Sequence, residues 1–235
     1  VAVGDLAGQQ VTTGIYNVLS GGLAGDALTD ADNNVAIGYS ALTTDTLGSK
    51  STAIGRSALA NQNFTSATDS HNTAVGFNAG GAVTTGQENT LVGSGAADAM
   101  TTGSSNTFIG NDTAGTGVVT GDSNTAVGKS AGLNLTSGDN NLLLGHDAGI
   151  TGSPGGNITT ASNTIVLGDE NISSFNCQVA LTVASDERDK TEFSDLNLGL
   201  EFVKSLEPVT YYWDRRSSYG DKEAEDYDLS AKTPD

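Results

Sequence analysis

The chain has 235 residues, 31 of them glycine, and a formal net charge of −18. Such acidity disfavours binding to nucleic acid, whose phosphates need Lys and Arg, and to an anionic membrane surface. No apolar run approaches membrane-spanning length, so we expect no membrane insertion. Large apolar side chains are too few for an ordinary globular core, and this composition favours a stack of repeats.

A short phrase, Asn-Thr-Ala-Val-Gly-x-x-Ala-Gly, recurs along the first three quarters of the chain. Its clearest copies are residues 72–80 and 124–132. Looser copies surround other central glycines: Gly4, Gly21, Gly38, Gly55, Gly93, Gly110, Gly145 and Gly168. Successive central glycines are 17, 17, 17, 21, 17, 17, 18, 17 and 23 residues apart. A near-constant period with a few insertions predicts an all-β parallel solenoid with about 17 residues per coil.

The three residues before each central glycine are short and rich in β-branched types, which predicts a strand. They include Val35-Ala36-Ile37, Thr73-Ala74-Val75 and Thr107-Phe108-Ile109. The third position is always Val, Ile or Leu in the regular copies, so we expect it to face the inside of the coil. The second position is Ala, Leu or Phe and should face the opposite way. Both faces would then be apolar, which predicts an obligate homo-oligomer, specifically a homotrimer.

The turns carry their own signals. The central glycines allow a sharp bend, and we expect the small residues three positions later to form a second, tightly packed wall. These are Ala41, Ala58, Ala79, Ala96, Ala131 and Ala148. The longest insertions, residues 61–70 and 151–161, should fall in loops between coils.

Asparagine recurs just before the strands, at Asn72, Asn89, Asn106, Asn124 and Asn141. A stacked amide ladder with a structural role is the favoured interpretation, with an ice-binding face as the alternative. Three aromatic residues, Tyr39, Phe64 and Phe77, are either exposed receptor contacts or packing residues.

Signals for a metal or cofactor are weak. Asp26, Asp30 and Asp32 could offer oxygen ligands to Ca²⁺, but their motif occurs once, so a turn is favoured. His71 and His146 lie in different coils and are interpreted as surface residues. We therefore expect no cofactor.

The repeats resemble the head repeats of trimeric autotransporter adhesins, as in residues 34–41, Asn-Val-Ala-Ile-Gly-Tyr-Ser-Ala. Similar repeats occur in phage tail fibres. The resemblance covers residues 1 to about 170 and implies a trimeric, left-handed parallel β-roll.

Composition changes near Ser185. Residues 1–184 hold three basic residues (Lys50, Arg56 and Lys129), whereas residues 185–235 hold seven. We expect a β-roll over residues 1–176, a connecting strand over 177–184 and a short α+β segment over 185–235. Within that segment Ser194 caps a helix over 195–206, and residues 209–213 form a strand.

The segment resembles the self-cleaving intramolecular chaperone at the C-terminus of phage endosialidase tailspikes and many tail fibres. Ser185-Asp186-x-Arg188-x-Lys190, the Leu-rich stretch at 196–206 and Glu207-Pro208-Val209-x-Tyr211-x-Trp213 carry the likeness. It implies trimer assembly and a cut at the bond before Ser185. Ser185 would then be the nucleophile, Lys190 its base and Asp186 a residue that holds the pair in place.

Two departures accompany the likeness. Asp189 replaces the aliphatic residue usual before the motif lysine, and a later Gly-x-Ile-Ala-Gln-like segment is missing. We therefore expect a partial chaperone domain. The chain starts inside a repeat without Met, which favours a piece of a longer protein.

Together these features favour an extracellular phage fibre or spike that assembles with itself and other virion proteins and attaches to a host glycan or protein. Its enzymatic activity would at most be a Ser–Lys autoprotease acting on its own chain. A bacterial trimeric surface adhesin or filament and a glycan-degrading tailspike are the alternatives. Acidic residues sit singly in the turns, which disfavours the hydrolase.

Overall fold

A computed structural model describes residues 1–178. Val1–Asn176 forms one compact unit, and Cys177–Asp235 is assigned to a second. The described strands are β1 (Ala2–Val3), β2 (Val18–Ser20), β3 (Val35–Ile37), β4 (Gly48–Ser49), β5 (Thr52–Ile54), β6 (Thr68–Asp69), β7 (Thr73–Val75), β8 (Thr90–Val92), β9 (Thr107–Ile109), β10 (Thr125–Val127), β11 (Leu142–Leu144) and β12 (Ile165–Leu167). Residues 1–178 contain no helix, so this part of the chain has no helix that could span a membrane.

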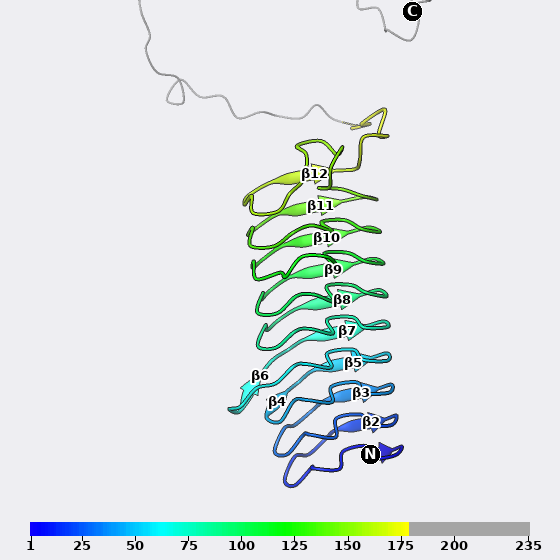
Figure 1. The fold of residues 1–235 in the computed structure, drawn as a ribbon, viewed down its shortest axis with the longest axis vertical. Helices are drawn as coiled ribbons and strands as arrows, with labels where there is room; N and C mark the ends of the chain where they lie inside the picture. The colour runs from blue at the N-terminus through cyan, green and yellow to red at the C-terminus, as the bar shows by residue number, and fades with distance from the viewer. Residues whose placement is uncertain (179–235) are drawn as a thin grey trace, which may run out of the picture. The chain divides into compact units, whose positions relative to one another are not determined.

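Ten of these strands stack into one parallel sheet in the order β1-β2-β3-β5-β7-β8-β9-β10-β11-β12 (Figure 1). Each coil adds one strand, and the chain returns to the next strand through the turns on the other side of the coil. Pairing is in register throughout: Ala126 lies opposite Phe108 on one side and Leu143 on the other. The predicted parallel β-solenoid of about 17 residues per coil is confirmed.

The core lies between the sheet and the returning turns. In each regular strand the second residue is buried: Ala36, Ala53, Ala74, Leu91, Phe108, Ala126 and Leu143 are all 0 % exposed. The third residue is half-buried or exposed, as at Ile37 and Ile109, which are 39 % and 38 % exposed. The expectation that the third position faces inward was therefore wrong. Because one side chain points in, its two neighbours along the strand must point out.

The narrowness of the coil explains this assignment. Opposite the sheet stands the predicted second wall, whose small residues are completely buried: Ala41, Ala58, Ala79, Ala96, Ala131 and Ala148. Leucines such as Leu42 and Leu59 fill the space beside them. With Ala at many inward strand positions, the two walls approach closely, and larger Leu or Phe side chains enter only in some coils.

Left-handed backbone conformations bend each coil. Gly93 has a φ of 138°, and a Cβ added there would lie 2.2 Å from the carbonyl oxygen of Gly110 in the next coil. Both features restrict this position to glycine. A non-glycine residue with positive φ also precedes the ladder position in each coil: Tyr16, Asn33, Lys50, His71, Glu88, Ser105, Ser123, Asn140 and Asn163. No residue type common to these positions predicts this second bend.

The predicted asparagine ladder is present and buried. The side-chain oxygen of Asn106 accepts the backbone N–H of Asn124 at 2.8 Å, and that of Asn124 accepts the N–H of Asn141 at 3.0 Å. Each side-chain amide also donates to a carbonyl of a turn, as Asn106 does to Gly121 at 2.9 Å. The ladder therefore satisfies buried backbone groups, which makes its role structural and removes the basis for an ice-binding face.

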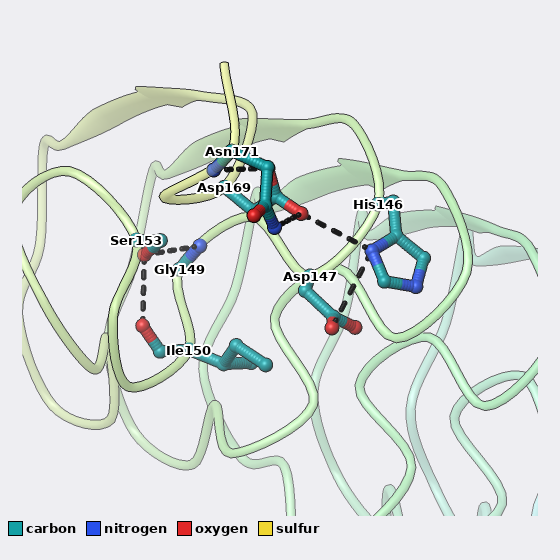
Figure 2. Close-up of polar contacts among 7 residues, drawn as sticks. All are labelled: His146, Asp147, Gly149, Ile150, Ser153, Asp169 and Asn171. Carbon is teal, nitrogen blue, oxygen red and sulfur yellow. Dashed lines mark hydrogen bonds and ion pairs between the residues drawn. The ribbon is translucent and has the colours of Figure 1, made fainter. Parts of the chain in front are cut away.

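Both long insertions lie in connections between coils, as predicted. Residues 61–70 include β6, which pairs with β4 in a small second sheet beside the main one (Figure 1). Phe64 in this insertion is 5 % exposed, so it is a packing residue. The insertion at 151–161 is braced by Ser153, whose hydroxyl accepts the N–H of Gly149 at 3.0 Å and donates to the carbonyl of Ile150 at 2.8 Å (Figure 2).

Candidate functional site

The outward surface of the main sheet is the most extensive candidate site. We call it the outer face and define it as the first and third residues of the nine three-residue strands in the main sheet, together with Val3 of the two-residue strand β1. Five consecutive strands place Thr first and Val or Ile third: β5, β7, β8, β9 and β10. The outer-face residues of these five strands are half-buried or exposed. At the two end strands of the sheet, exposure rises to 68 % at Ile165 in β12 and 62 % at Val3 in β1. Parallel pairing aligns the aliphatic side chains into a continuous apolar stripe, the kind of surface that marks an interaction site.

A second feature follows the strands, one residue after the central glycine. Tyr39, Arg56 and Phe77 occupy this position in three successive coils, and we call them the aromatic row. Tyr39 and Phe77 are 54 % and 51 % exposed. The guanidinium carbon of Arg56 lies 5.4 Å from the centroid of the Phe77 ring. Sequence reasoning identified both aromatic residues but missed Arg56, because only the stacking of coils places it between them.

A buried carboxylate, Asp45, was also missed. Its Oδ1 accepts backbone N–H groups from Gly48 and Phe64, both at 3.0 Å, and its Oδ2 accepts from Gln62 at 2.6 Å. Gln62 also donates to Ser51, which replaces asparagine at one step of the ladder, at 2.9 Å. Three donors thus satisfy the carboxylate, and the cluster anchors the insertion at 61–70 where the ladder is interrupted. Its role is structural.

The weak calcium candidates do not converge. Asp30 accepts a hydrogen bond from the Thr13 hydroxyl, and Asp32 accepts the N–H of Ile15 at 2.7 Å. Asp26 accepts the hydroxyl of Thr43. Asp30 and Asp32 therefore bind the preceding coil, whereas Asp26 binds the following one. Among residues 1–178 no group of three His, Cys, Asp or Glu side chains is arranged to hold a metal ion.

His146 lies on the surface, as expected, but it has acidic neighbours. Its Nδ1 is 3.4 Å from the carboxylate oxygens of both Asp147 and Asp169 (Figure 2). Asp169 also accepts the side-chain amide of Asn171 at 3.1 Å and its backbone N–H at 3.0 Å. These two hydrogen bonds, the side-chain one first, lower the pKa of Asp169, and His146 lowers it further. The cluster secures the turn after β12, the last described strand. His71 is exposed as well.

Asp98 shows the opposite shift. Burial raises the pKa of Asp98 because it disfavours the charged form, and the nearby carboxylate of Asp112 raises it further. A hydrogen bond from Asn78 at 3.4 Å opposes both effects. Asp98 therefore takes up a proton at a higher pH than an ordinary aspartate.

The predicted cleavage residues Ser185, Asp186 and Lys190 lie outside the described residues. So do the expected helix over 195–206, the strand over 209–213 and all of the connecting strand except residues 177 and 178. Cys177 is exposed.

Residues 185–230 have a counterpart among known protein families. No curated protein and no solved structure matches the chain. Residues 185–230, which contain the Ser–Lys motif, match the family described as chaperone of endosialidase. The chain thus joins a parallel β-solenoid to a segment similar to the chaperone of endosialidase, a combination that fits a protein of the phage fibre or endosialidase type.

Proposed function

We propose that this chain forms the shaft of a homotrimeric phage fibre or spike, which residues 185–235 help to assemble and which attaches the virion to its host. The outer face carries the proposal. An aliphatic stripe along a ten-stranded sheet is a surface that water solvates poorly, and three copies around a common axis would cover it on every chain. The proposed solenoid is left-handed, as its resemblance to the heads of trimeric autotransporter adhesins implies.

The chaperone match supports the same assembly from the other end of the sequence. Long parallel stacks form slowly, because each coil must find its register on the preceding one. A C-terminal segment that first brings three chains together would raise their local concentration and align their registers. The segment at 185–230 is similar to a family whose description is that of a chaperone.

The proposal includes self-cleavage before Ser185. Lys190 takes the proton of the Ser185 hydroxyl, and the oxygen attacks the Ala184 carbonyl. The peptide C–N bond breaks, an ester forms, and the proton passes to the released amine of Ser185. Water then hydrolyses the ester and leaves residues 1–184 and 185–235 as separate chains. Asp186 holds Ser185 and Lys190 in place.

Light scattering on the purified Ser185→Ala variant, which keeps the Ala184–Ser185 bond, tests the assembly. We expect three times the mass of one chain at every concentration examined, whereas a monomer at high dilution would overturn the trimer.

Denaturing mass spectrometry tests the cleavage separately. We expect the unchanged chain to yield two fragments, while the Ser185→Ala and Lys190→Met variants remain at the full 23.7 kDa. Ser205→Ala is the matched control, a serine of the same segment outside the motif, and should cleave normally. A trimer whose Ala184–Ser185 bond stays intact would reject self-cleavage and leave the assembly proposal standing.

A further inference from the structure

The aromatic row is assembled only by the fold. Tyr39, Arg56 and Phe77 are separated by 17 and 21 residues in the sequence, yet β3, β5 and β7 are consecutive in the sheet. The four extra residues of the second interval belong to the insertion at 61–70 and do not disturb the row. Two strand spacings place Tyr39 and Phe77 roughly 10 Å apart.

Both rings have exposed surface. A Cβ added to Gly22 would lie 3.3 Å from Cδ2 of Tyr39, so the absence of a side chain at Gly22 gives the tyrosine ring room against the coil. Tyr39 remains 54 % exposed and Phe77 51 % exposed. Flat apolar rings of this kind, with a polar group beside them, suit ligands that are apolar on one side and polar at the rim.

Arg56 sets the charge of the expected ligand. It is one of three basic residues in residues 1–184, which hold fourteen acidic ones. Within residues 1–178 it forms no ion pair, and its guanidinium instead stacks on Phe77. An exposed guanidinium without a carboxylate partner in an acidic protein favours an anionic ligand, and its planar donors fit a carboxylate through two hydrogen bonds.

We propose that Tyr39, Arg56 and Phe77 bind an acidic polysaccharide. Two of its sugar rings would lie on Tyr39 and Phe77, and a carboxylate between them would pair with Arg56. A polymer whose repeat contains uronic acids, either alternating with neutral sugars or contiguous, has this arrangement. The inference rests on the proposed host-attachment function and names the class of glycan involved.

Calorimetric titration of the full chain with hyaluronan and alginate hexasaccharides tests the proposal. At least one should bind, and its carboxyl-reduced form should bind much more weakly. The Phe77→Ala, Tyr39→Ala and Arg56→Gln variants should each lose roughly tenfold in affinity, which corresponds to about 1.4 kcal/mol for each contact. Added salt should weaken binding by the unchanged chain more than by Arg56→Gln.

Two matched controls separate the row from general features of the surface. Lys129→Gln removes a cation from the same position three coils beyond Phe77, and Tyr16→Ala removes an exposed aromatic residue elsewhere. Both should stay within about twofold of the unchanged chain. Equal losses in Lys129→Gln and Arg56→Gln would overturn the proposal, as would binding of neither oligosaccharide.

Light scattering on each variant distinguishes the remaining outcomes. A change in oligomer mass caused by the row variants would show that a second copy covers the row, which overturns the glycan site. A trimer that binds neither sugar would reject this inference and leave the proposed fibre intact, whereas a monomer would reject the fibre itself.

Discussion

The inner and outer faces of the main sheet use the same three-residue strands in opposite ways. Phe108 points inward and is completely buried, while its neighbour Ile109 points outward and is 38 % exposed. The inner face is satisfied within the chain by the alanine wall opposite. The outer face is not covered by any described residue, although it is rich in aliphatic side chains. Folding of one coil therefore depends on the inner face, whereas the outer face is available for association.

Replacing a bend glycine should have the largest effect on this arrangement, because the bend separates strand from turn. In Gly93→Ala the new Cβ would meet the Gly110 carbonyl at 2.2 Å, at a φ of 138°. We expect a loss of more than about 4 kcal/mol in the free energy of unfolding, measured by urea denaturation. Gly155→Ala is the control, because its Cβ meets nothing within 4 Å and only its φ of 81° is strained. Equal losses would show that the close stacking of coils is wrong.

The inner face is tested by Phe108→Ala. Phe108 is among the largest completely buried side chains, and its removal leaves a cavity between two rigid walls. We expect a loss of about 3–5 kcal/mol by urea denaturation. Ile109→Ala, at the next residue, should cost less, about 1 kcal/mol, since its side chain is already 38 % exposed within one chain. The reverse order of these two losses would contradict the assignment of faces.

The buried asparagine ladder is tested by Asn106→Ala. The variant leaves the backbone N–H of Asn124 buried without its side-chain acceptor. We expect a loss of about 1–3 kcal/mol in the free energy of unfolding. Asn111→Ala removes an exposed amide that donates to the Ser94 carbonyl, and should change stability by at most about 0.5 kcal/mol. If Asn106→Ala lost no more unfolding free energy than Asn111→Ala, the ladder would not have the structural role assigned to it.

The outer face is tested by charge. The double variant Ile54→Asp with Ile109→Asp should keep the circular dichroism spectrum of the unchanged chain, because the coils still fold. Light scattering should nevertheless show the mass of a single chain. Carboxylates placed in a covered apolar interface lose their hydration without gaining partners. Val118→Asp, at an exposed aliphatic residue outside the sheet, should keep the oligomer mass. Retention of the trimer by the double variant would place the interface elsewhere.

The smallest expected effect concerns the turn after β12. The folded-state pKa of Asp169 lies below its ordinary value because of Asn171. This carboxylate therefore contributes stability above its ordinary pKa, and the contribution is lost as pH falls through the lowered value. In Asn171→Ala the Asp169 pKa should rise toward normal, as read by carboxyl NMR titration. His146→Gln should raise it less, and an unchanged pKa in Asn171→Ala would refute the hydrogen-bond cause.

The sequence alone determined the repeat, its period, the strand positions, the second alanine wall and the asparagine ladder. These follow from local rules, because every coil repeats the same turn chemistry and β-branched residues before each central glycine. Even the sites of the insertions followed, since extra residues fit only where they do not interrupt the stack.

Which face of each strand is inside became clear only from the stacked coils. Ala36-Ile37 and Phe108-Ile109 are apolar on both sides, so hydrophobicity could not orient them. Side-chain size could not orient them either, because Phe108 is inside and the smaller Ile109 is outside. In-register pairing gives all the strands one common orientation, so Phe108 points inward with Leu91 and Ala126 on either side. The aromatic row was equally hidden, because Arg56 becomes a neighbour of Phe77 only when coils stack. The repeating sequence determines the strand and the turns of each coil, because these depend on residues that are close together in the chain. Contacts between coils depend on how the coils stack, and no single repeat contains that information.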